Sequence, residues 1–292
     1  MQRSLVLRAS VPSPSRNARI RSYWAAHPCG RNVVGLPEGD PAFFDEHDRI
    51  LGVWCPYIRG YLSWLAAVEG FVLEVGCGMG FHTASMVRLG RTTVAVDLTW
   101  ESARLAALRL KRQGLKGYVV VADGAALPFR DGAFGGSMAM GVIQHTDLPE
   151  RVVGEMHRVT RSGGRALFMI YNRFSRHTLW ILGFLWPVMG FLHVAPGFLR
   201  RWAFRIRPGL QDYWLQNRLP GFQDVVNAGT DAYGLKNPLS RLYSLSQARR
   251  VLSPFRVRHF SREDSHEPGR ATRFHRWLYS RVGFFLYAQC TK

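Results

Sequence analysis

Three glycines spaced two residues apart form the first pattern that points to chemistry. Gly76, Gly78 and Gly80 follow the apolar run 71–75, and a stretch compatible with a helix comes next. Glycines in a turn between a strand and a helix accept positive φ angles and let a ligand approach the backbone closely. The pattern therefore predicts a site for a nucleotide-type cofactor. A dinucleotide fingerprint would need its third glycine at position 81, which is Phe, so the pattern argues against NAD.

Acidic residues end the next two apolar runs. Asp97 follows 92–96, and Asp123 comes shortly after 118–121. Because the carboxyl ends of parallel strands meet at one edge of a sheet, both carboxylates are expected beside the glycine turn. A carboxylate at Asp97 could accept hydrogen bonds from both hydroxyls of a ribose. Structural roles are the alternative, with Glu74 of the first run capping the next helix and Asp123 capping an adjoining turn.

Two residues beyond the later runs are candidates for a general base. His145 follows the run 136–140 and the short apolar stretch after it, and Tyr171 follows 165–170. An imidazole is the better base, because an ordinary phenol is protonated at neutral pH. The alternative for His145 is a hydrogen bond that holds its own loop, and the alternative for Tyr171 is a place in a substrate wall.

A parallel sheet is needed to bring these residues together. Strands are predicted over 71–75, 92–96, 118–121, 136–140 and 165–170, then over 255–260 and 284–291. Helices are predicted over 82–89, after the capping residue Thr99, and over 245–252. Another helix is expected to start with a capping box at 147–150 and to end at 162–164. This alternation predicts an α/β fold with right-handed crossovers.

These segments together resemble the class I S-adenosylmethionine-dependent methyltransferases, in particular the subgroup that includes quinone-biosynthesis C-methyltransferases. The resemblance covers about residues 70–172 and rests on Leu73 to Gly80, on Val96-Asp97, on 123–129 and on Gly163-Gly164. It implies a Rossmann-like, seven-stranded, mostly parallel sheet with helices on both faces and an apolar helical insertion after strand five. The usual Pro-Gly-Gly of the fifth turn begins with Ser162 here, which affects turn stiffness only.

The resemblance also implies S-adenosylmethionine as the cofactor. Glu74 and the glycine turn would hold its methionine end, Asp97 its ribose hydroxyls, and Asp123 its adenine amino group. The implied cofactor residues are Glu74, Gly76, Cys77, Gly78, Gly80, Asp97, Leu98, Asp123, Gly124, Ala125 and Met140. A sulfonium cofactor without phosphate needs no cluster of Lys or Arg, and residues 71–84 contain neither.

The net charge of +19 in 292 residues is concentrated at the two ends. Residues 1–37 hold six Arg and no acid, and residues 156–292 hold 22 basic and 6 acidic side chains. Because 35 of the 39 basic residues are Arg, a codon bias is an alternative to a binding surface. The four Cys are scattered and form no CxxC pair, so we expect no disulfide scaffold, no structural zinc and a reducing, cytoplasmic location.

The expected domains follow from composition. Residues 1–22, rich in Arg, Ser and Pro, predict a disordered basic arm, with a transit peptide as the alternative, and no secretion signal follows. Residues 23–292 would form the methyltransferase domain, with its core at about 70–172 and 245–292 and a helical insertion at about 174–244. Tyr23 and Trp24, with 27–30 after them, are either a flap over the cofactor or an ordinary surface helix.

The insertion contains an apolar segment of 22 residues, 178–199, without Asp, Glu, Lys or Arg. Its length suits a bilayer, but Pro187 and Pro196 lie inside it and two strands must rejoin the sheet after it, so we expect no crossing. A lid over an apolar acceptor pocket, a segment in an anionic membrane interface and a buried helical pair remain. The flanking arginines favour the interface: Arg173, Arg176, Arg200, Arg201, Arg205 and Arg207.

Three functions are consistent with these patterns. The first is methyl transfer to a hydrophobic or lipid-linked small molecule, with peripheral contact to an anionic membrane. The second is an RNA methyltransferase that uses the basic C-terminal part, although residues 141–144 lack the Asn/Asp-Pro-Pro-Tyr/Phe motif of RNA N-methylating enzymes. The third is a cofactor-binding protein without turnover. The stretch 237–244 introduces the helix at 245–252 and indicates no substrate.

Overall fold

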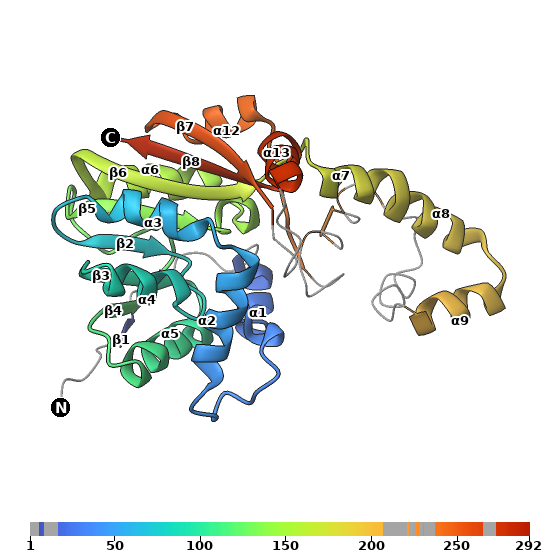
Figure 1. Cartoon of the computed structure of the whole chain (residues 1–292), viewed down its shortest axis with the longest axis horizontal. Coiled ribbons are helices and arrows are strands. Elements are labelled where there is room, and N and C mark those ends of the chain that lie inside the picture. Colours follow the sequence, from blue (N-terminus) through green and yellow to red (C-terminus); the bar gives the residue numbers. More distant parts are fainter. Residues whose placement is uncertain are drawn as a thin grey trace.

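The computed structural model describes residues 6–8, 17–206, 221, 223, 226, 227, 230, 237–264 and 273–292. Within these residues, eight strands form one sheet in the order β1-β4-β3-β2-β5-β6-β8-β7 (Figure 1). Every neighbouring pair is parallel except those of β8, which runs antiparallel to β6 and β7. The strands are β1 (Val6–Arg8), β2 (Val72–Val75), β3 (Thr93–Asp97), β4 (Tyr118–Val121), β5 (Phe134–Met140), β6 (Thr160–Tyr171), β7 (Arg256–Glu263) and β8 (Phe285–Thr291).

The predicted seven-stranded, Rossmann-like sheet is confirmed, and β1 adds an eighth strand at its edge. β1 pairs with β4 because the outer edge of β4 offers unpaired backbone groups to a neighbouring extended segment. The disordered arm expected over 1–22 is therefore wrong at 6–8, and again from Asn17, where α1 (Asn17–Ala26) begins. The rest of that prediction, 1–5 and 9–16, lies outside the described residues.

Helices cover both faces of the sheet. α3 (Ile58–Ala66), α4 (Phe81–Arg88) and α5 (Trp100–Arg112) pack on one face, and α6 (Pro149–Val159) and α12 (Leu245–Val251) pack on the other. Side chains of β2 alternate accordingly: Leu73 and Val75 join the core under α6, and Val72 joins the core under α3. The other helices of the domain are α2 (Phe43–Trp54), α13 (Arg273–Val282) and the 3-10 turns η1 (Arg31–Val33) and η2 (Ile143–His145).

Two predictions about α6 are wrong. Its N-cap is Leu148, which has no capping side chain, and the Leu148 amide donates to the Thr146 hydroxyl at 3.3 Å. The segment 162–164 does not end the helix but belongs to the first part of β6. Backbone hydrogen bonds of 3.0 Å join Lys292 to Gly163 and Gly164, which draws this segment into the sheet.

The insertion forms an arm that extends away from the sheet (Figure 1). We call α7 (Arg176–Trp180), the π-helical turn Ile181–Leu185, α8 (Trp186–Val194) and α9 (Gly197–Ile206) the arm. Pro187 has no amide hydrogen to donate, yet the helix continues through it. The wider π-helical turn directly before it accommodates the missing hydrogen bond. Large apolar side chains along the arm are exposed, so the predicted buried helical pair is wrong: Leu179, Trp180, Phe184, Trp186, Phe191, Val194, Phe198, Trp202 and Ile206.

The run Arg176–Val194 is long and apolar enough, by length and composition, to cross a membrane. The strand before it, β6, and a strand after it, β8, are paired along seven residues. A single crossing would put these paired strands on opposite sides of the bilayer. The topology therefore argues against a crossing.

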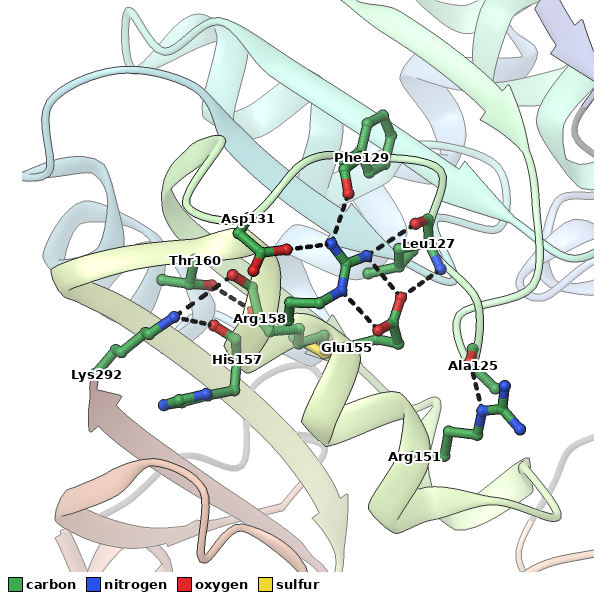
Figure 2. Close-up of polar contacts among 11 residues, drawn as sticks. Ala125, Leu127, Phe129, Asp131, Arg151, Glu155, His157, Arg158, Thr160 and Lys292 are labelled. Atoms are coloured by element: carbon green, nitrogen blue, oxygen red, sulfur yellow. Dashed lines mark hydrogen bonds and ion pairs between the residues drawn. The ribbon is translucent and has the colours of Figure 1, made fainter.

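A network on α6 holds the loop that follows β4 (Figure 2). The Arg158 guanidinium donates to the backbone carbonyls of Phe129 and Leu127 at 2.7 and 3.0 Å and to the Asp131 carboxylate at 2.7 Å. Glu155 pairs with Arg158 and also accepts the Leu127 amide at 2.8 Å. This loop begins with Asp123, so α6 fixes the carboxyl end of β4.

We expect Arg158→Met to lower the free energy of unfolding by about 2 to 4 kcal/mol, because several hydrogen bonds to a charged group are lost together. Urea unfolding measures this change. The control is Arg161→Met, whose partner Glu69 lies 3.7 Å away in an exposed ion pair, and a change below about 0.5 kcal/mol is expected there. Equal losses in the two variants would contradict the role of the network.

Candidate active site

A cavity of about 520 Å³ opens at the carboxyl ends of β2, β3, β4 and β5. The chain adds β3 and β4 on one side of β2 and then adds β5 on the other side. In a parallel sheet, a crevice forms at the carboxyl ends of the strands where the strand order changes direction in this way. Ten of the thirteen predicted site residues line the cavity: Gly76, Cys77, Gly78, Asp97, Leu98, Asp123, Gly124, Met140, His145 and Tyr171. Glu74, Gly80 and Ala125 are not among the lining residues.

The glycine turn lies against the end of β3. The amides of Gly76 and Cys77 both donate to the Val96 carbonyl, at 2.7 and 3.0 Å. Gly76 has a φ of +70°, and a Cβ there would come within 2.2 Å of Val142, so no other residue fits. Gly80 serves packing instead, because a Cβ there would meet Ala106 of α5 at 3.0 Å.

Asp97 connects the turn to β3. Its carboxylate accepts the Gly78 amide at 2.9 Å and both the amide and the hydroxyl of Thr99 at 2.9 Å. Burial raises the pKa of Asp97, and the hydrogen bonds from Thr99 and Gly78 act in the opposite direction. The carboxylate is thereby held in one orientation at the cavity wall.

Asp123 and its neighbours form the wall beyond β4. The Asp123 carboxylate accepts the Ala125 amide at 2.8 Å, as expected for a turn-capping residue, and the residue still lines the cavity. Ala125 lies outside the wall, where its carbonyl accepts the Arg151 guanidinium at 3.0 Å (Figure 2). Ala125 thus shapes the loop without facing the cavity.

Glu74 lies behind the glycine turn. It is fully buried, its carboxylate accepts the Thr83 hydroxyl, and it contacts the His82 Nδ1 at 3.1 Å. Both partners are side chains of the first turn of α4, so Glu74 is tied to this helix through side chains, and it does not cap the helix as the alternative expected. Glu74 is not among the residues that line the cavity, whereas His82 is, and the contact of Glu74 with the methionine end stays a prediction.

His145 and Tyr171 come together as expected, with ring centroids 5.4 Å apart. The His145 Nδ1 lies 2.8 Å from the backbone carbonyl of Leu239. Because a carbonyl can only accept, Nδ1 carries the proton and Nε2 is the basic nitrogen of the neutral ring. His145 therefore binds a segment 94 residues away in the chain.

Residues of α1 and of the segment directly after it line the cavity. Ile20 and Trp24 of α1 line it, together with Cys29 and Gly30, and the Trp24 ring lies edge-on to His145 with centroids 5.2 Å apart. Of the two interpretations of this segment, the flap matches the structure.

His47 on α2 is a wall residue that sequence analysis missed. Its side chain is buried, and its Nδ1 accepts a hydrogen bond from the Arg109 guanidinium at 2.9 Å. Arg109 is fully buried, pairs with Asp48 and donates to the Met79 carbonyl at 2.7 Å. Burial and the Arg109 charge lower the pKa of His47 to about 3, so the ring is neutral. No local pattern indicates this contact, because Arg109 lies 62 residues further along the chain.

The remaining wall is largely apolar and aromatic. Met169, Phe284, Phe285 and Tyr287 come from β6, β8 and the turn before β8, and Leu51 and Trp54 come from α2. Asp264 after β7 is the third acid of the wall. No Lys or Arg is found among the described residues that line the cavity.

Known proteins share this sequence pattern and fold. Residues 73–168 match the family described as a methyltransferase domain. The ubiquinone biosynthesis O-methyltransferase of Paracidovorax citrulli is 30% identical over 198 residues, covering 65% of this chain and 78% of that protein. The protein of the same name from Cupriavidus pinatubonensis is 25% identical over 233 residues, covering 72% and 87%.

A solved structure extends the likeness to almost the whole chain. The geranyl diphosphate C-methyltransferase from Streptomyces coelicolor A3(2), solved with Mg²⁺, geranyl diphosphate and S-adenosyl-L-homocysteine, has a TM-score of 0.54 and covers 96% of this chain and 99% of its own. At 13% identity, this likeness concerns the fold alone.

The cavity fits S-adenosylmethionine by charge and by donor set. A sulfonium is favoured beside Asp97 and Asp123 and would be disfavoured by Lys or Arg, which the described wall lacks. The His47 Nε2 is a buried polar atom without a hydrogen-bond partner among the described residues, as expected of a wall that a polar ligand completes.

The lowered pKa of His47 makes stability depend on pH. The unfolded chain protonates this residue near pH 6.5 and the folded chain only near pH 3, so stability falls as the pH drops below 6.5. We expect His47→Gln to remove this contribution, which amounts to about 2 kcal/mol between pH 7 and pH 5. Urea unfolding of both proteins at the two pH values measures it. A difference between the proteins that does not change with pH would show that folding does not lower the pKa of His47.

Proposed function

Because this chain belongs to the class I S-adenosylmethionine-dependent methyltransferases, we propose that it transfers the methyl group to a hydrophobic or lipid-linked small molecule. The observation that carries the acceptor class is the apolar, aromatic wall formed by Met169, Tyr171, Phe284, Phe285 and Tyr287, which lies in the same cavity as the glycine turn. An apolar acceptor would bury its surface there, whereas a phosphate-rich acceptor would find no cation on the described wall.

The names of the relatives support the same class. Two of them are ubiquinone biosynthesis O-methyltransferases, and a structural neighbour was solved with geranyl diphosphate. These names concern those proteins. Combined with the apolar wall, they favour a ring or chain of low polarity as the acceptor of this protein.

We assign the cofactor to the end of the cavity formed by β2, β3 and β4. Asp97 would accept from the ribose hydroxyls, Asp123 would face the adenine, and the backbone of Gly76 to Gly78 would lie under the amino-acid end. S-adenosylmethionine supplies a methyl carbon activated by positive sulfur. The main task of the chain is therefore alignment of the two reactants, which can lower a barrier by up to about 7 to 11 kcal/mol.

His145 is the base that we propose for an acceptor hydroxyl. The proton would move from the hydroxyl oxygen to the His145 Nε2. That oxygen would form the new bond to the methyl carbon as the bond from this carbon to sulfur breaks, and S-adenosyl-L-homocysteine would be the leaving group. The Leu239 carbonyl at Nδ1 supports this role, because it leaves Nε2 as the basic nitrogen. The rings of Trp24 and Tyr171 restrict the imidazole further. Tyr171 would then act as a wall residue.

We expect Asp97→Asn to weaken binding of S-adenosyl-L-homocysteine about 10- to 100-fold, because the ribose hydroxyls would lose their hydrogen bonds to a charged group. Isothermal titration calorimetry measures the affinity. Glu101→Gln, which changes an exposed acid in the first turn of α5, is the matched control and should bind like the wild type. Unchanged affinity in Asp97→Asn would refute the ribose assignment.

The arm supports a peripheral contact with an anionic membrane, where a lipid-like acceptor would reside. Its exposed Trp and Phe side chains suit the interface between headgroups and acyl chains. Arg201 and Arg205 of α9 are exposed beside Phe198, Trp202 and Ile206, and no acid occurs between Glu155 and Asp212. Arg207, which also belongs to the predicted flank, lies outside the described residues.

We expect the protein to float with vesicles of phosphatidylglycerol and phosphatidylcholine, and the triple variant Arg200→Glu, Arg201→Glu and Arg205→Glu to stay in the soluble fraction. Each well-placed cation contributes about 1 kcal/mol at such a surface. The control reverses the same number of charges on exposed residues of the domain: Arg161→Glu, Arg250→Glu and Arg256→Glu. Equal loss of flotation in both triple variants would mean that net charge and not the arm determines binding.

A further inference from the structure

The C-terminal end of the insertion is hydrogen-bonded to the turn that carries the proposed base, His145. We call residues 237–243 the clamp segment. Its backbone and side chains donate hydrogen bonds to backbone carbonyls of η2 and of the residue after it. The Arg241 amide donates to the Gln144 carbonyl at 3.0 Å, the Arg241 guanidinium donates to the Thr146 carbonyl, and the Tyr243 hydroxyl donates to the Ile143 carbonyl at 3.3 Å. In the sequence, this stretch only introduces the helix at 245–252. That interpretation explains none of these contacts.

The clamp segment also joins the end of β6. The Tyr243 amide donates to the Tyr171 carbonyl at 2.8 Å, and the Arg173 amide donates to the Tyr243 carbonyl at 2.9 Å. Tyr243 thus forms an isolated parallel bridge with Asn172. One short segment therefore holds both residues that were candidates for the base, although they come from different strands.

The contact to His145 itself is built from three residues. Leu239 contributes the carbonyl at 2.8 Å from Nδ1, and the Ser240 hydroxyl lies 3.3 Å from the same nitrogen. Asn237 donates to this hydroxyl at 2.8 Å and accepts the Leu239 amide at 3.1 Å. Ser240 and Asn237 are buried, so their hydrogen bonds are shielded from water and orient the loop strongly.

The clamp segment is in turn anchored to the rest of the insertion. The Ser240 amide donates to the Asn227 side chain at 2.8 Å, and the Gln223 side chain donates to the Ser240 carbonyl at 2.6 Å. The position of the Leu239 carbonyl therefore depends on residues of the insertion and not on the sheet alone.

We propose that Asn237 and Ser240 are positioning residues that aim the Leu239 carbonyl at His145 and thereby fix its tautomer with the proton on Nδ1. This inference rests on the proposed role of His145 as the base and adds the insertion to the catalytic machinery. Without the carbonyl at Nδ1, nothing in this contact would prevent the proton from moving to Nε2, and the ring could not accept a proton there.

The test measures the tautomer directly. Long-range ¹H–¹⁵N correlation spectra distinguish a protonated from an unprotonated imidazole nitrogen, and the signals of His145 are identified by their loss in His145→Gln. The wild type should show the Nδ1-H tautomer. Asn237→Ala and Ser240→Ala should show a substantial fraction of Nε2-H, and Ser253→Ala, an exposed serine beyond α12, should match the wild type.

Binding of S-adenosyl-L-homocysteine, measured on the same samples, separates this inference from the proposed function. We expect its affinity to change less than about twofold in Asn237→Ala and Ser240→Ala, because the clamp segment does not contribute to the wall around Asp97 and Asp123. Absence of binding in the wild type would overturn the proposed function. An Nε2-H tautomer in the wild type, or an unchanged tautomer in folded variants, would overturn the inference alone.

Discussion

The hydrogen bond from the Gly78 amide to the Asp97 carboxylate ties the glycine turn to the end of β3. Together with the two amides that donate to the Val96 carbonyl, it sets the distance between the turn and the acid. Parallel pairing of β2 with β3 on one side and β5 on the other then opens the cavity above the turn. The proposed cofactor site, the proposed acceptor wall and the proposed base all lie around this one connection.

Buried charges behind the wall form a second layer. Glu74 orients His82 and the first turn of α4, and Arg109 joins α5 to α2 through Asp48 and His47. Removing one partner of such a buried pair leaves an uncompensated charge or donor, which is costly. These groups therefore act by keeping the turn and the flap residues in place, and they affect a ligand through the residues that line the cavity.

The insertion has two ends with different surroundings. The arm exposes aromatic side chains and arginines to the outside, whereas the clamp segment is buried against the η2 turn and β6. If both proposals hold, the same part of the chain would contact the membrane and orient the base. Such a division suits an enzyme whose acceptor is kept in a lipid phase, because the acceptor would reach the base from the side of the arm.

The sequence alone determined seven of the eight described strands, the glycine turn and the two strand-end acids, whereas it did not indicate β1. Strands and turns are encoded by local patterns, and the order of alternating strands and helices restricts how they can be connected. The ends of the elements were predicted less well. The helix end predicted at 162–164 is wrong, because pairing with Lys292 places that segment in β6.

Only the tertiary structure decided which side chains face the cavity. Glu74 belongs to the same motif as Gly76 and Gly78, yet its carboxylate contacts α4 and does not line the cavity, because a motif does not state the direction of a side chain. His47 and Leu239 reach the site from segments far away in the chain, where no spacing could indicate them. The π-helical turn before Pro187 likewise depends on local hydrogen bonding that composition does not specify. Contacts between distant segments arise from packing, and packing is a property of the folded chain as a whole.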